Sequence, residues 1–228
     1  MTLRTNARLA GTAYLLYIAA GISQMVVFNQ ATAGAARIPD QLANIARHAS
    51  LMGVNVILSL VMAVCAVTLG VTLWALTRDE DRDIAVMGMV CRVVEGALNA
   101  ASVSETLSLM ALATTSVAAA GGPDAGTITV LGGQMLRGGA VGGAGAFLFG
   151  LGSLCFCWLF VRSRTIPAWL AWIGLVASAL WVIGMPLQLG GFLGGPATYV
   201  MWISMAVFEL TVAVWLIVKG VAAPARPV

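Results

Sequence analysis

The sequence predicts an all-α fold: a polytopic transmembrane helix bundle of about six spans in one integral-membrane domain, residues 1–228, with both termini cytoplasmic. Hydrophobic residues make up 60% of the 228 residues and charged residues only 9%, whereas a soluble domain is nearer half apolar and a quarter charged. Apolar runs of about 20 residues, enough to cross a hydrocarbon core about 30 Å thick, recur along the whole chain. These two observations exclude a soluble enzyme and a disordered chain.

Each predicted span is an apolar run that ends at charged residues, Gly or Pro. The six runs cover about residues 9–28, 51–76, 84–117, 134–161, 168–189 and 199–218. The first is longer than the roughly 7–15 apolar residues of a secretory signal, so we expect a retained span. The third is long enough to tilt or to project into water, and the fourth begins near Gln134 or earlier.

Lys and Arg in the connecting segments predict the orientation, because cytoplasmic segments carry an excess of both. Eight basic residues lie on the side that holds the two termini, against two on the opposite side. The eight are Arg4, Arg8, Arg78, Arg82, Arg162, Arg164, Lys219 and Arg226, and the two are Arg37 and Arg47. This bias predicts that both termini are cytoplasmic.

The segment from Asn29 to Ser50 is the only long connection expected on the opposite side. Pro39 is suited to the first turn of a short helix. Such a helix would place Ile38, Leu42, Ile45 and Ala49 on one face. We expect it to lie in the membrane interface, with a lid over an outward-facing cavity as the alternative.

The fourth span begins with a run of small residues. Gly138 and Gly142, like Gly139 and Gly143, are four residues apart, a spacing that lets helix backbones approach closely in lipid. These glycines are therefore candidates for contact with a partner helix. A phosphate-binding loop is excluded because no Gly-Lys-Ser/Thr follows the run.

Ionisable residues inside the spans are the strongest indication of function, because each is costly in lipid unless it is paired or hydrated. At 1.5 Å per residue, Arg92 and Glu95 lie about 12 and 16 Å from the inner boundary, and Glu209 lies about 15 Å from the outer one. Glu105 and Arg137 fall near the outer boundary, where their matched depth and opposite charge predict an ion pair.

Arg92, Glu95, Asn99, Ser102 and Thr106 follow one another at steps of three or four, so they form a polar stripe on one helix face. The stripe must face the bundle interior. One interpretation is a paired network that only fixes helix packing. The other is a hydrated site, formed by Arg92, Glu95, Asn99 and Glu209, for a small molecule, an ion or a proton. With two carboxylates and one arginine, one carboxyl could carry a proton.

No cofactor, metal site or catalytic residue is indicated. The only histidine, His48, lies in the outer segment, so paired haem ligands and Ser-His sites are missing from the spans. Cys155 and Cys157 lack the neighbouring ligands of a metal site, and no lysine inside a span could hold retinal. The net charge of +3 is too small to indicate a nucleic-acid partner.

Several stretches in order resemble a known family. Arg8-Leu9-Ala10-Gly11 leads into the first span, Asn44-Ile45 precedes the second, and Arg92-Val93-Val94-Glu95 lies in the third. Phe160-Val161-Arg162-Ser163-Arg164-Thr165-Ile166-Pro167 and Leu170-Ala171-Trp172-Ile173-Gly174 follow. This order, from about Arg8 to Leu189, resembles the bacterial multi-pass family of domain of unknown function 4386 (DUF4386).

The resemblance implies a multi-pass protein of the bacterial plasma (inner) membrane, and it implies no reaction, ligand or catalytic residue. One departure is the Gly-rich start of the fourth span, where family members often have a polar or His-containing stretch. A site built on that stretch in other members is therefore not expected here.

Three functional hypotheses remain. The first is a transporter-like or ligand-sensing bundle with the interior polar site. The second is a structural or partner-binding membrane protein whose buried charges only specify helix packing. The third, a membrane enzyme acting on lipid, is not supported by any identified nucleophile. The partner common to all three is the lipid bilayer.

Overall fold

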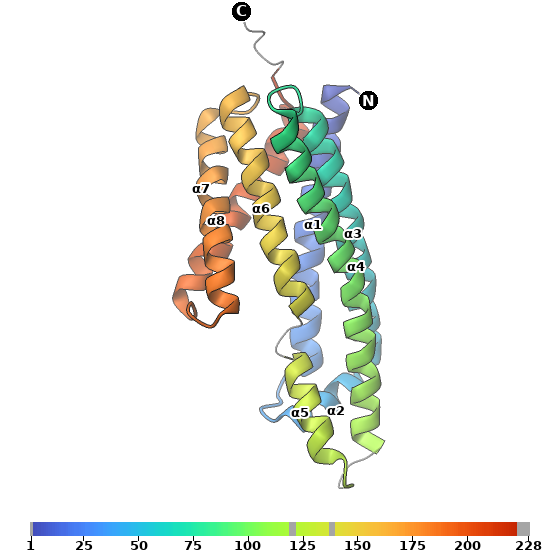
Figure 1. The fold of residues 1–228 in the computed structure, drawn as a ribbon. Coiled ribbons are helices and arrows are strands. Elements are labelled where there is room, and N and C mark those ends of the chain that lie inside the picture. Colours follow the sequence, from blue (N-terminus) through green and yellow to red (C-terminus); the bar gives the residue numbers. More distant parts are fainter. Residues whose placement is uncertain (1, 119–121, 137–139, 223–228) are drawn as a thin grey trace, which may run out of the picture.

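The computed structural model describes residues 2–118, 122–136 and 140–222, which form α-helices and connecting turns without a strand (Figure 1). The helices are α1 (Leu3–Thr32), α2 (Ile38–Arg47), α3 (Ala49–Thr77), α4 (Arg82–Ala118), α5 (Ala125–Leu136), α6 (Ala140–Ser163), α7 (Ala168–Leu189) and α8 (Pro196–Val218). Among the described residues, six of them are long and apolar enough to cross a membrane: α1, α3, α4, α6, α7 and α8. The predicted all-α class with six spans is confirmed.

The six spanning helices close a ring in chain order. Each packs against the next, from α1 to α3, α4, α6, α7 and α8, and α8 packs back against α1. Side chains that point toward the axis from non-adjacent helices therefore meet in the centre. The interior is apolar toward the chain termini, where Leu69, Phe156, Phe160, Phe208 and Leu216 belong to one buried cluster.

Close backbone approach joins the two ends of this ring. A Cβ atom added to Gly11 on α1 would lie 2.6 Å from the carbonyl oxygen of Ala213 on α8. On the opposite side of the ring, a Cβ atom at Gly152 of α6 would lie 3.1 Å from the carbonyl oxygen of Gly88 on α4. Small residues at such contacts are typical of packing between membrane helices, because they permit dense van der Waals contact.

A second compact region, which we call the cap, consists of α2, α5 and the adjoining ends of α1, α3 and α4. Figure 1 shows α2 and α5 at the end of the bundle remote from the N-terminus. The 37 residues of α4 give a length of about 55 Å, against about 33 Å for α7. The cap has its own apolar cluster, which contains Ala31, Leu42, Ile45, Met52, Leu109, Ala113 and Ile128.

The helix expected at Pro39 is present as α2, with Pro39 in its first turn. The apolar face of α2 was expected to contact the membrane interface, but it packs inside the protein. Leu42 and Ile45 are fully buried and pack within the protein against residues of α4 and α5. The apolar face of α2 is covered because α5 packs against it. The sequence did not distinguish α5 from the start of the fourth span. Gln134 therefore belongs to α5, and the spanning helix α6 begins at Ala140.

Exposed ion pairs connect the α3–α4 turn to the end of α6. The Nε atom of Arg162 lies 3.1 Å from Oε1 of Glu80, and its Nη1 lies 3.4 Å from Oδ2 of Asp81. Because all three side chains are partly exposed, each pair contributes on the order of 1 kcal/mol or less.

The α3–α4 turn and the start of α5 lie at opposite ends of the bundle (Figure 1). Labelling of these two segments therefore tests the predicted orientation. Asp79 and Asp124 are exposed in these two turns. The basic bias predicts that an impermeant thiol reagent labels Asp124→Cys in intact cells and labels Asp79→Cys only after permeabilisation. The reverse pattern would show that the termini are extracytoplasmic.

Candidate functional site

The interior of the ring holds a charged pair on α4. Arg92 and Glu95 are each only 1% exposed. Arg92 points into the ring because Gly70 of α3 leaves room for it. A Cβ atom at Gly70 would lie 3.0 Å from Cβ of Arg92. The sequence places the pair on one helix face, and close packing against α3 positions it.

Arg92 and Glu95 form a buried ion pair, with Nη1 of Arg92 2.9 Å from Oε2 of Glu95. None of the three guanidinium nitrogens of Arg92 has an aligned hydrogen-bond acceptor among the described residues, so the contact is electrostatic rather than a directed hydrogen bond. A guanidinium cannot give up its proton in a protein. The nearby carboxylate is therefore a permanent requirement of this position.

Two aromatic rings from other helices complete the surroundings of the guanidinium. Cζ of Arg92 lies 5.2 Å from the ring centroid of Tyr17 on α1 and 5.0 Å from that of Phe149 on α6. The two rings are parallel, with centroids 6.1 Å apart, so the guanidinium lies beside the pair. Contacts of this type attract a cation to the ring faces, most strongly where water is excluded.

Tyr17 also binds the other member of the pair. Its hydroxyl donates a 2.5 Å hydrogen bond to Oε1 of Glu95, while Oε2 faces Arg92. One carboxylate thus connects α1 to α4 and is itself held in place by a charge and a hydrogen bond. Hydrogen bonds to a charged acceptor are about twice as strong as those between neutral groups.

Glu209 approaches the pair from α8. It is 6% exposed and lies close enough to interact electrostatically with Arg92, Glu95 and the Tyr14 phenol of α1. Its Oε1 atom is buried and has no hydrogen-bond partner among the described residues. We call Arg92, Glu95, Tyr17, Glu209 and Tyr14 the Arg92 site. The site contains one positive charge and two carboxylates.

Between the Arg92 site and the cap lies a group of uncharged polar side chains, which we call the polar layer. It consists of Gln24 on α1, Asn55 and Ser59 on α3, and Asn99 and Ser102 on α4. Nε2 of Gln24 donates to Oγ of Ser59 at 2.6 Å, and Oγ of Ser102 lies 3.4 Å from the same atom. Oδ1 of Asn55 and Nδ2 of Asn99 are buried without a hydrogen-bond partner among the described residues.

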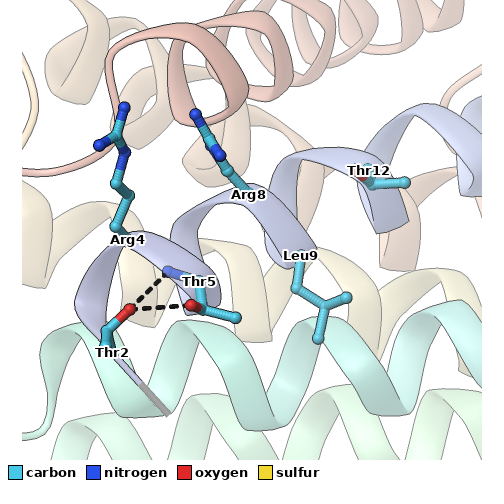
Figure 2. A pocket seen from close by; sticks show the side chains of 6 residues that line it. All are labelled: Thr2, Arg4, Thr5, Arg8, Leu9 and Thr12. Carbon is cyan, nitrogen blue, oxygen red and sulfur yellow. Dashed lines mark hydrogen bonds between the residues drawn. The ribbon is translucent and has the colours of Figure 1, made fainter.

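Two open pockets on the described surface lie away from the Arg92 site. One, of about 330 Å³, lies at the start of α1. Figure 2 shows its lining, where Thr2 caps the helix by accepting from the Thr5 amide and where Arg4 and Arg8 lie one turn apart. Another, of about 340 Å³, lies between α7 and α8 and is lined mainly by apolar residues such as Trp172 and Val176. The two pockets are lined by other residues than those of the Arg92 site.

The structure brings three of the four predicted interior residues into electrostatic range: Arg92, Glu95 and Glu209. Asn99 follows one turn after Glu95 and belongs to the polar layer. Of the outer pair, Glu105 is half-buried on α4, whereas Arg137 lies outside the described residues. That ion pair stays a prediction.

The glycines predicted to contact a partner helix divide into two groups. Gly138 and Gly139 lie outside the described residues. Gly142 is exposed and faces open space. Gly143 packs against Leu189 of the same chain, because a Cβ atom at Gly143 would lie 2.6 Å from Cδ2 of Leu189. The part of this run that the structure describes therefore leaves only Gly142 open for contact with another molecule.

Sequence reasoning missed Tyr14 and Tyr17 of the Arg92 site and the adjoining Phe149. It also missed Gln24, Asn55 and Ser59 of the polar layer. A signal existed for some of them. Tyr in membrane helices concentrates at the interfaces, so Tyr17 in mid-span is unusual, and an amide such as that of Gln24 inside a span calls for a partner. Phe149 carried no such signal, because a phenylalanine in an apolar helix has no distinguishing pattern.

The Arg92 site presents the carboxyl groups of Glu95 and Glu209 to the interior of the ring. Within the described part of the chain, no three His, Cys, Asp or Glu side chains gather as a metal site would require. The Glu209 carboxyl is buried and carries oxygen atoms, which are the ligands that hard cations prefer.

Comparison with known proteins agrees with this description of a membrane bundle. The model of the family described as "Domain of unknown function (DUF4386)" matches residues 9–220, which include all six spans in whole or in large part. No curated protein matches the chain, and no solved structure matches it.

Proposed function

This chain belongs to the DUF4386 family and is a multi-pass membrane protein, and we propose that it is a transporter-like or ligand-sensing bundle whose Arg92 site takes up a proton or a small cation at Glu209. The observation that carries this proposal is the buried Oε1 atom of Glu209, which has no hydrogen-bond partner among the described residues. We also propose a bacterial plasma (inner) membrane location, which the family membership of the chain supports. Uptake at Glu209 does not depend on that location.

The balance of buried charges supports the uptake of a proton or cation at Glu209. Arg92 and Glu95 neutralise each other at 2.9 Å. Glu209 then contributes a negative charge that no second buried cation among the described residues offsets. An uncompensated charge in a low-dielectric interior costs several kcal/mol. A proton or a bound cation removes that cost, and its release restores the cost. Occupancy of Glu209 is therefore coupled to the stability of the bundle.

The geometry also supports a response to occupancy. Glu209 comes from α8, while its electrostatic partners come from α4 and α1. A change in charge at Glu209 therefore alters the electrostatic interactions of α8 with α1 and α4. Phe149 connects the site to Trp181 on α7 at 5.2 Å between ring centroids, and Trp181 contacts Trp202 on α8 at 4.5 Å. Tryptophan fluorescence is therefore a natural reporter.

Glu209→Gln tests the proposal, because it keeps the side-chain shape and removes the charge. If the occupant is a cation, then in detergent Na⁺ or K⁺ at constant ionic strength, with choline as the replacement, should raise the melting temperature of the wild type and leave that of Glu209→Gln unchanged. A cation at about 100 times its dissociation constant stabilises by about 2.7 kcal/mol. Glu105→Gln, in the half-buried outer part of α4, is the matched control and should respond as the wild type does.

Infrared spectroscopy separates the two occupants. A proton on Glu209 adds the carbonyl band of a protonated carboxyl, which Glu209→Gln should lack and Glu105→Gln should retain. A cation leaves that band absent and produces the salt-dependent melting instead. If Glu209→Gln matches the wild type in both measurements, Glu209 takes up neither and the proposal is wrong.

The second candidate is a structural or partner-binding protein, and one observation favours it. Arg92 and Glu95 are almost completely enclosed, and together with Tyr17 and Phe149 they connect α1, α4 and α6. In that case the charges only specify packing, and Gly142 beside open space is the surface for a partner helix. The absence of both Glu209 effects would support this candidate.

A further inference from the structure

The polar layer lies on one side of the Arg92 site only. Along α4, Asn99 and Ser102 follow Glu95 toward the cap by about 6 and 10 Å. Gln24 follows Tyr17 in the same direction along α1, and Ser59 precedes Gly70 along α3. Three neighbouring helices thus carry polar side chains at similar depth. From this asymmetry we infer that the polar layer is the route by which the proton or cation reaches the Arg92 site, and that the cap covers its outer end.

The hydrogen bonds of the polar layer support a route between helices. Gln24 of α1 donates to Ser59 of α3, and Ser59 contacts Ser102 of α4. Asn55 Oδ1 and Asn99 Nδ2 are a buried acceptor and a buried donor that lack partners within the described residues. Unsatisfied buried polar groups are the usual positions of internal water. Water at these two atoms would extend the hydrogen-bonded path in both directions.

The opposite side of the Arg92 site has a different character. Toward the termini, the interior is filled by large apolar side chains such as Leu73, Phe156 and Phe160, all of which are at most 2% exposed. The buried hydroxyls of Thr72 and Thr77 bond to carbonyl groups of their own helix, so they offer no path between helices. A charged species therefore meets a polar route from the cap side and an apolar barrier from the terminus side.

The cap covers the outer end of this route with apolar residues. Met52 of α3 and Leu109 of α4 belong to the buried cluster of the cap, together with Leu42 and Ile45 of α2. Leu42 packs onto α5, because a Cβ atom at Gly132 would lie 2.7 Å from its Cδ1. Loosening this contact should open the route.

This inference rests on the proposed function, and thiol accessibility tests it without using Glu209. Ser59→Cys and Ser102→Cys are nearly isosteric changes in the polar layer. Ser153→Cys on α6, at 2% exposure and on the terminus side of Phe149, is the matched control. The four native cysteines are buried and provide the background. Each of the three cysteine variants is first shown to melt as the wild type does.

A small, charged, membrane-impermeant thiol reagent is added to vesicles from either side, with Asp124→Cys identifying the cap side and Asp79→Cys the terminus side. From the cap side, Ser59→Cys and Ser102→Cys should react at least about tenfold faster than Ser153→Cys, because an apolar barrier excludes the charged reagent. Adding Leu42→Ala should raise the rate at Ser102→Cys further and leave that at Ser153→Cys unchanged.

Equal rates for Ser102→Cys and Ser153→Cys from the cap side, with and without Leu42→Ala, would overturn the inferred route. So would equal access to Ser102→Cys from both sides. Labelling is repeated with Glu209→Gln, which should not change it. Fast labelling without a cation or proton effect of Glu209→Gln would leave the route standing and reject the proposed function, so the two failures are distinguishable.

Discussion

Arg92→Leu is expected to lower the free energy of unfolding by about 3–5 kcal/mol, the typical cost of removing one member of a buried charge pair. The substitution leaves Glu95 and Glu209 in the interior without their counter-charge. It also removes the cation that lies 5.2 and 5.0 Å from the ring centroids of Tyr17 and Phe149. The loss should appear as a lower melting temperature of the detergent-solubilised protein.

Two further variants separate charge from shape at this position. Arg92→Lys keeps the charge but lacks the planar guanidinium that faces a carboxylate and an aromatic ring together, so it should restore only part of the stability. Arg92→Leu combined with Glu95→Gln should be milder than Arg92→Leu alone, since one stranded charge is removed. If Arg92→Leu melts as the wild type does, the charge pair contributes nothing to the bundle and the central position assigned to Arg92 is wrong.

Gly11→Ala should destabilise the closure of the ring by about 1–3 kcal/mol through overpacking. The added Cβ atom would lie 2.6 Å from the carbonyl oxygen of Ala213 and 3.2 Å from the amide nitrogen of Ile217. Both are backbone atoms of α8 and cannot turn away as a side chain could. Helices α1 and α8 must therefore separate, although alanine is intrinsically the better helix former.

Gly21→Ala is the matched control, because it makes the same change in the same helix. Its nearest contact would be the Cε atom of Met62 at 3.8 Å, an ordinary van der Waals distance. Thermal melting should show Gly21→Ala at or above wild-type stability and Gly11→Ala clearly below it. Equal melting of the two variants would mean that α1 and α8 approach less closely than the structure indicates.

Much of the fold followed from local patterns. The predicted run 168–189 coincides with α7, and the run 84–117 differs from α4 by only one or two residues at each end. Apolar runs predict spans well because every backbone polar group in lipid must be bonded within its own helix. The boundary between α5 and α6 was missed, because the predicted run 134–161 is apolar or small apart from Gln134 and Arg137, and both fit the boundary end of a single span.

The candidate site was predictable where one helix carried it. Arg92 and Glu95 share a face of α4 because they are three residues apart, and the depth of Glu209 follows from its distance to the span end. Tyr17 is 78 residues from Glu95 in the chain, yet its hydroxyl bonds to that carboxylate. No spacing rule connects residues on different helices, so this contact was not predictable.

The sequence by itself determined the membrane class, six spans, the short helix at Pro39 and a polar stripe on α4, since hydropathy and helical periodicity act over a few neighbouring residues. Only the tertiary structure decided that α8 closes the ring onto α1, that α5 covers the apolar face of α2, and that polar side chains accumulate on the cap side of Arg92. The physical reason is that these features depend on distances between helices. Those distances are set by how Gly11, Gly70 and Gly132 let particular backbones and side chains approach, and packing of this kind couples residues that are far apart in the chain.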